Sequence, residues 1–174
     1  DYQSKLSNIL FQKDSNLAQT GQFAFFDCKQ LKTIHIPNSV TTFGAGTFCN
    51  SGLVSITFEE NSTLDYIQYH AFYNCQDLTY IKIPASVRYI EDYDRDGVFW
   101  NCSSLKVVEF EDNSKLEYFA KAFLYCNALE TVNFGANSSI TTISGAAFEK
   151  CASLKTIVIP EGVTTIDGWA FCEC

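Results

Sequence analysis

One segment of the sequence has residue types and a spacing that could bind a metal ion. Asp92, Asp94 and Asp96 alternate with other residues and are followed directly by Gly97. This order matches the opening of a calcium loop, D-x-D-x-D-G, in which alternate carboxylates converge because glycine permits a sharp turn. The twelfth position of such a loop is Ser103, where the full motif has a bidentate glutamate. Two interpretations stay open: a calcium site that is weak or completed from elsewhere in the chain, and a solvated acidic loop.

Eight cysteines form the second group with possible chemistry. Six of them recur at one position of a repeated pattern: Cys28, Cys75, Cys102, Cys126, Cys151 and Cys174. Equivalent side chains on stacked units point the same way, which is poor geometry for a disulfide, so we expect free thiols packed as small hydrophobic residues. Cys49 and Cys172 each follow a phenylalanine, and for them a local disulfide or an exposed thiol are both open. No C-x-x-C pair with zinc spacing occurs.

Composition and motifs exclude several classes of function. Twelve Lys and Arg against 20 Asp and Glu give a net charge of −8, which disfavours nucleic acid and anionic membrane surfaces as partners. Apolar stretches are far shorter than the ~20 residues of a membrane-spanning helix, so we expect no membrane insertion. The two histidines, His35 and His70, belong to different units, and no phosphate loop, nucleophile elbow or H-E-x-x-H motif occurs. We therefore expect no enzymatic activity and, calcium aside, no cofactor.

A repeat accounts for most of the sequence. A phenylalanine recurs at a near-constant interval, and in most cases a small residue precedes it. The positions are Phe25, Phe48, Phe72, Phe99, Phe123, Phe148 and Phe171, and the intervals are 23, 24, 27, 24, 25 and 23 residues. Each unit continues into L-x-x-I-x-I, the alternation typical of a short strand, and then a turn and a second apolar pair. Units of this size bury a continuous core only when stacked. The pattern predicts a solenoid of the α/β repeat class, mostly β with little helix, with about seven units of 23–27 residues and a parallel sheet on its concave side.

The residues that carry this pattern also carry a resemblance. The string A-F-x-x-C-x-x-L-x-x-I-x-I-P-x-x-V-x-x-I resembles the BspA-like (Treponema-type) leucine-rich repeat family, and the resemblance covers Leu6 to Cys174. Proteins of this family are surface or secreted proteins of anaerobic bacteria and parasitic protists, and several are credited with adhesion. The resemblance implies a cell-surface or extracellular recognition protein whose ligand is a protein, a matrix component or a glycan. The alternative is a structural protein that packs against copies of itself or other chains.

The domain organisation follows from the repeat. Residues 1–174 are expected to form one solenoid domain, with the acidic insertion near 91–97 lengthening one unit. The chain stops directly after the seventh A-F-x-x-C element, whereas natural solenoids cover their open ends with capping units. We expect a fragment of a longer array; the alternative is an end covered by a neighbouring chain, which would allow oligomers through uncapped ends.

Three sets of exposed residues are candidate recognition sites. On the outward side of the L-x-x-I-x-I strands, here called the strand face, we predict ligand contacts at His35, Thr57, Tyr80, Lys82, Glu109 and Asn133. A second column contains Tyr66, Tyr89 and Tyr118 on three consecutive units, which fits either cross-strand pairing or a binding stripe. A third column, directly after the buried phenylalanine, contains Phe26, Tyr73, Trp100 and Leu124 and is expected to form a ridge on the convex side.

Three N-x-S/T sequons begin at Asn61, Asn101 and Asn137. They could carry glycans only in a eukaryotic secretory protein. Asn101 directly precedes a cysteine that is expected to be buried, which makes it the poorest acceptor of the three.

Overall fold

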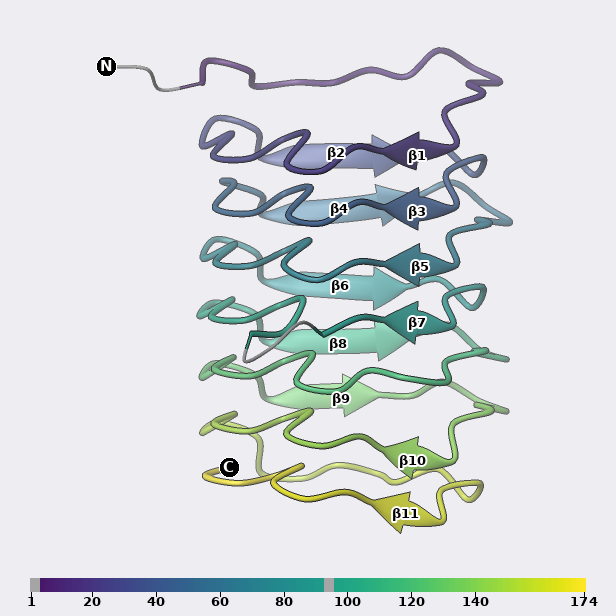
Figure 1. The fold of residues 1–174 in the computed structure, drawn as a ribbon, viewed down its shortest axis with the longest axis vertical. Coiled ribbons are helices and arrows are strands. Elements are labelled where there is room, and N and C mark those ends of the chain that lie inside the picture. The colour runs from purple at the N-terminus through teal and green to yellow at the C-terminus, as the bar shows by residue number, and fades with distance from the viewer. Residues whose placement is uncertain (1–3, 93–95) are drawn as a thin grey trace.

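The computed structural model describes residues 4–92 and 96–174. The chain winds into an all-β parallel solenoid of about six turns of ~23 residues, stacked along one axis (Figure 1). Each turn is called a rung and is named by its buried phenylalanine. The predicted solenoid is confirmed, and the described residues contain no helix, although the sequence analysis expects a little.

Two ladders of parallel strands run along the stack. The long-strand ladder contains β2 (Thr33–Ile36), β4 (Ser55–Phe58), β6 (Tyr80–Ile83), β8 (Val107–Phe110) and β9 (Thr131–Asn133). The short-strand ladder contains β1 (Gln19–Thr20), β3 (Thr42–Phe43), β5 (Tyr66–Ile67), β7 (Tyr89–Ile90), β10 (Thr142–Ile143) and β11 (Thr165–Ile166). Arrows of the two ladders point in opposite directions because each rung folds back on itself (Figure 1). The outward surface of the long-strand ladder is the strand face.

Burial alternates along the long strands as the L-x-x-I-x-I pattern predicts. In β6 the side chains of Ile81 and Ile83 are fully buried, whereas those of Tyr80 and Lys82 are exposed. Ile81 pairs in register with Val108 of β8, which in turn pairs with Val132 of β9. Equal positions of successive units therefore meet side by side, at the ~4.8 Å spacing of hydrogen-bonded strands.

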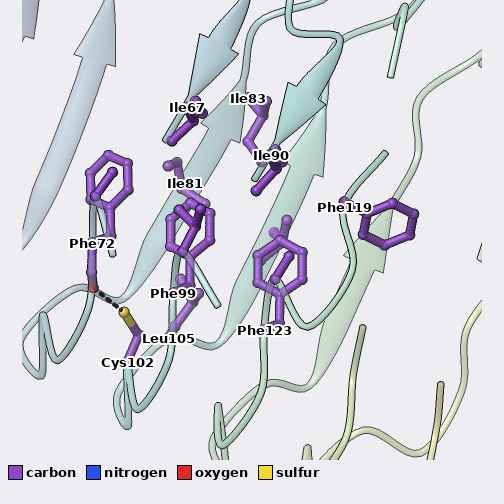
Figure 2. Packing of buried hydrophobic residues seen from close by; sticks show 14 of the residues in the cluster. Ile67, Phe72, Ile81, Ile83, Ile90, Phe99, Cys102, Leu105, Phe119 and Phe123 are labelled. Atoms are coloured by element: carbon purple, nitrogen blue, oxygen red, sulfur yellow. Dashed lines mark hydrogen bonds between the residues drawn. The ribbon is translucent and has the colours of Figure 1, made fainter. Parts of the chain in front are cut away.

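A ladder of phenylalanine rings fills the middle of the solenoid. The rings of Phe72, Phe99 and Phe123 lie face to face in Figure 2, with centroids 4.8 Å and 5.1 Å apart and interplanar angles of 4° and 13°. The stack continues to Phe48 on one side and to Phe148 on the other, at 5.3 Å and 5.5 Å. All five side chains have no solvent-exposed area. The ladder explains why phenylalanine recurs, because its flat ring fits the strand spacing and supplies core volume.

Left-handed residues explain why the A-F-x-x-C segment forms no helix. Within one unit both His70 and Asn74 have positive φ, at 60° and 57°. A right-handed helix cannot continue through such a residue, since the left-handed conformation turns the chain the other way. Equivalent pairs recur at Lys121 and Tyr125. The N–H of each second residue then bonds to the next rung, as from Asn74 to the Trp100 carbonyl at 2.8 Å.

All eight cysteines are free thiols. At the repeated position five are buried as predicted, whereas Cys174 is exposed. Cys49 is a buried free thiol, so neither a disulfide nor an exposed thiol holds there, and Cys172 is a half-buried free thiol. The sulfur of Cys102 donates to the carbonyl oxygen of Phe72 on the preceding rung at 3.1 Å (Figure 2). Cys75, Cys126 and Cys151 make the same contact to the phenylalanine of their preceding rung, at 3.1 to 3.3 Å. The position therefore needs a small apolar side chain with a weak donor, which is what cysteine offers.

Burial of the thiols should control their reactivity, because the thiolate is the nucleophile. Burial raises the pKa of Cys49 to about 11, and it also raises the pKa values of Cys126 and Cys151. We expect iodoacetamide at neutral pH to modify Cys172 and Cys174 in the folded protein, since these two have accessible surface. Peptide mass mapping with and without guanidinium would test this. Fast labelling of the other six cysteines without denaturant would contradict the packing described here.

Candidate recognition surface

The structure brings the residues predicted on the strand face into one surface. His35 lies beside Thr57 in the β2–β4 register, and their Nδ1 and Oγ1 atoms are 2.8 Å apart. Lys82, Glu109 and Asn133 are successive partners across β6, β8 and β9. These five positions form two column segments of exposed or half-buried polar side chains, one on each side of the boundary between β4 and β6.

Tyr80 lies in the neighbouring outward column of the strand face, and its side chain reaches across to β8. Its hydroxyl donates to Oε2 of Glu109 at 2.7 Å. Partial burial, together with this carboxylate, raises the pKa of Tyr80 to about 12, so the phenol stays a neutral donor. The ring is 38% exposed, which leaves aromatic surface available to a ligand. Tyrosine in such a setting is enriched at binding interfaces.

The long-strand ladder is interrupted between β4 and β6. Strands β2 and β4 form one sheet and β6, β8 and β9 form another. No ladder joins β4 to β6, although the N–H of Thr79 donates to the Val54 carbonyl at 3.4 Å just before the two strands. An open hollow lies over this interruption, lined by Ile56, Thr57, Phe58, Tyr80, Lys82 and Glu111. Three residues predicted as ligand contacts, Thr57, Tyr80 and Lys82, thus surround the same hollow.

A short unit accounts for the interruption. The Phe48 rung has Ser51-Gly52-Leu53 where other rungs have C-x-x-L, so the approach to β4 is one residue shorter. The N–H of Gly52 donates to the Cys28 carbonyl at 3.1 Å, and that of Val54 donates to the Lys32 carbonyl at 2.8 Å. The shortened segment therefore holds β4 against the Phe25 rung, and the break falls on its other side. The sequence shows that this unit is one residue shorter. It does not show on which side β4 lacks a paired strand.

An ion pair bridges the short unit. Nζ of Lys32 on the Phe25 rung lies 3.0 Å from Oδ2 of Asp77, two rungs away. Both side chains are about half exposed, so the pair contributes little to stability. Its effect is to place one cation and one anion at the edge of the strand face.

The tyrosine column lies on the short-strand ladder, away from the hollow. Tyr66 and Tyr89 meet at 5.9 Å in an edge-to-face arrangement. The hydroxyl of Tyr89 donates to Glu117, and that of Tyr118 donates to Oδ1 of Asp92 at 2.8 Å. These carboxylate partners, which the sequence analysis missed, support the cross-strand interpretation. A ligand role for the three tyrosines stays a prediction.

Two of the three aspartates of the acidic insertion lie within the described residues. Asp92 accepts the Tyr118 hydroxyl and lies 3.2 Å from Nζ of Lys121. Asp96 lies 3.9 Å from Nε2 of His70, and Asp94 lies outside the described residues. Among residues 4–92 and 96–174, no three acidic, histidine or cysteine side chains come together as metal ligands. Calcium binding by the insertion stays a prediction.

The sequon asparagines occupy two different environments. Asn61 and Asn137 are exposed turn residues with φ of 56° and 54°. Asn101 is half-buried, and its amide donates to Oδ1 of Asn74 at 2.8 Å, which in turn donates to Asn50. A glycan at Asn101 would break this amide ladder. Glycosylation at all three stays a prediction.

Stacked parallel rungs that each bury a leucine and an alternating pair of apolar residues define a leucine-rich-repeat solenoid. The chain belongs to the BspA-type leucine-rich repeat family, because six copies of the model described as "BspA type Leucine rich repeat region" match residues 2–94 and 61–174. No match is found among curated proteins. Within the described part of the chain, no helix has the length and apolar character that crossing a bilayer requires.

Solved structures share the fold. The leucine-rich repeat protein TpLRR of T. pallidum is 26% identical with a TM-score of 0.74, over 92% of this chain and 71% of that chain. The pneumococcal vaccine antigen PcpA is 22% identical with a TM-score of 0.50, over 94% of this chain and 53% of that chain. A leucine-rich cell surface protein of Faecalibacterium prausnitzii is 18% identical with a TM-score of 0.38, over 97% of this chain and 78% of that chain.

Proposed function

We propose that this protein is a non-enzymatic cell-surface or secreted recognition protein that binds a protein or matrix ligand through its strand face. The observation that carries the proposal is the hollow at the β4–β6 interruption, where Thr57, Tyr80 and Lys82 converge. A regular ladder offers a ligand the same surface on every rung. The interruption makes this part of the strand face differ from the paired strands on either side, which gives a ligand a distinct place to bind.

The chemistry of the hollow suits a protein ligand. The half-buried Phe58 supplies apolar surface, Lys82 supplies a cation, and Tyr80 combines an aromatic face with a hydroxyl. Interfaces combine a small aromatic and apolar centre with a polar rim in this way. The surfaces of repeat solenoids are extended and rigid, so little conformational entropy is lost on binding.

Lys82→Ala and Tyr80→Ala are expected to weaken binding to the cognate ligand at least about tenfold, as central interface residues do. The probes are immobilised fibronectin, laminin and collagen, measured by biolayer interferometry. Lys115→Ala is the matched control, because Lys115 is also an exposed lysine but does not line the hollow. Equal affinity of all three variants for a ligand that the unmodified protein binds would contradict the strand-face proposal.

Assembly with other chains is the alternative function. Leu10 near one end of the stack is 84% exposed, and Ile166 and Trp169 near the other are 54% and 67% exposed. Exposed apolar residues of this size favour association. Light scattering after size exclusion distinguishes the two functions, since assembly through the ends requires defined oligomers and strand-face recognition does not.

A further inference from the structure

The ridge that follows the buried phenylalanines contains one aromatic stack that ends abruptly. Tyr73 and Trp100 lie face to face, with centroids 4.6 Å apart and an interplanar angle of 10°. The next residue in this column is Leu124, which is too short to continue the stack. Tyr125 instead approaches Trp100 at 5.6 Å and 60°, edge to face. The indole face that points away from Tyr73 therefore meets no parallel ring among the described residues.

A pocket opens beside Trp100. Trp100 and Tyr125 form its aromatic side, and Leu124 and Ala146 line its apolar part. Ala146 stands two residues before its phenylalanine, where an earlier rung has the much larger His70. The pocket thus exists because two side chains on consecutive rungs are short. Its remaining lining is charged and consists of Asp96, Lys121 and Glu149.

This combination of groups matches the two surfaces of a sugar ring. A pyranose presents an apolar face of C–H groups. The partial positive charge on these hydrogens is attracted to the negative face of an indole ring. Its hydroxyls both donate and accept hydrogen bonds, and the pocket offers carboxylate acceptors at Asp96 and Glu149. Lys121, which lies 3.2 Å from Asp92, adds an ammonium donor to the same lining.

A cationic ligand fits less well. The ammonium of Lys150 already lies 4.5 Å from the centroid of the Tyr125 ring and donates to its hydroxyl at 2.8 Å. The chain thus supplies its own cation to that ring. A second cation in the pocket would also be repelled by Lys121.

We propose that the pocket between Trp100 and Glu149 is a binding subsite for a neutral pyranose, with the ring stacked on Trp100 and hydroxyls bonded to Asp96 and Glu149. The subsite lies outside the strand face and goes beyond the function proposed above. A glycan bound here would be recognised independently of a protein ligand on β4 and β6.

Tryptophan fluorescence tests this proposal directly. The chain has two tryptophans, Trp100 and Trp169, so the Trp169→Phe variant reports on Trp100 alone. The probes are methyl β-glucoside, methyl β-galactoside, methyl α-mannoside and N-acetylglucosamine, titrated to tens of millimolar. We expect a saturable change in fluorescence with at least one sugar. A flat response to all four would overturn the proposal, as would saturable binding of tetramethylammonium in the absence of sugar binding.

Two further variants in the Trp169→Phe background locate the site. Leu124→Phe should extend the aromatic stack, fill the pocket and abolish the sugar response, and Glu149→Gln should weaken it about tenfold. Phe26→Leu is the matched control, because Phe26 occupies the same column far from the pocket and should leave affinity unchanged. Circular dichroism melting would show that each variant folds. Unaltered affinity in both folded pocket variants would contradict the assignment, whatever the strand face binds.

Discussion

Replacing Phe123 by alanine is expected to lower the free energy of unfolding by about 3–5 kcal/mol. The ring is fully buried and stacks between Phe99 and Phe148, at 5.1 Å and 5.5 Å. Removing it leaves a cavity as well as losing apolar contact. The cavity cannot collapse easily, because backbone hydrogen bonds such as Phe123 N–H to Ala147 C=O at 2.9 Å hold the neighbouring rungs at their spacing.

Denaturant unfolding followed by circular dichroism would measure this loss. Phe26→Ala is the matched control, since Phe26 also lies in an A-F-x-x-C segment but is 47% exposed, and we expect a change below about 1 kcal/mol. In a solenoid each rung contacts only its neighbours, so the transition should broaden if the two ends of the stack separate. A loss below about 1 kcal/mol for Phe123→Ala would contradict the phenylalanine ladder.

The sequence predicted the stacking axis because a repeat constrains it. Phe72, Phe99 and Phe123 occupy equal positions in units of similar length, and equal positions in a parallel stack have the same environment. The same reasoning predicted the buried column of cysteines. It could not predict the hydrogen bond from Cys102 to the Phe72 carbonyl, because that bond depends on the offset between two rungs.

Local conformation was predictable only where the residue type signals it. Asparagine tolerates the left-handed region, so Asn74 and Asn101 give a sequence signal for the turns that exclude a helix. Lys121 and Tyr125 adopt the same conformation without any such signal. Their φ is imposed by the hydrogen bonds of the stack, and this is why the expectation of a little helix does not hold in the described residues.

The candidate sites arise where the repeat is irregular, and irregularities were the hardest features to interpret from sequence. The repeat pattern places Trp100 and Leu124 in one column. The pocket also depends on Tyr125, which packs edge to face with the indole, and the sequence does not show this contact. The same pattern predicts that Tyr80 lies on the strand face, but it does not predict the interruption between β4 and β6. The pocket and the interruption both depend on how one rung packs against the rungs on its two sides, and the sequence of a single unit does not determine that packing.

Gly52→Ala tests the origin of the strand-face interruption and is expected to destabilise the protein by about 1–3 kcal/mol. A Cβ at this position would overlap the carbonyl oxygen of Lys29 and lie 2.8 Å from its carbonyl carbon. Backbone atoms cannot move aside as a flexible side chain can. The Phe48 rung would have to move away from the Phe25 rung, which would lengthen the 2.8 Å bond from Val54 to Lys32.

Gly168→Ala is the control for this substitution, because a Cβ there meets no atom within 4 Å. It should leave stability unchanged or raise it slightly, by restricting the unfolded chain. Equal thermal midpoints for the two variants would show that the short unit is not held tightly against the Phe25 rung.

Because Gly52 positions β4, its alanine variant should also weaken strand-face binding at temperatures where the protein remains folded. Sugar binding beside Trp100, two rungs away, should persist in the same variant. That separation would connect the missing residue of one unit to the interruption of the strand face between β4 and β6.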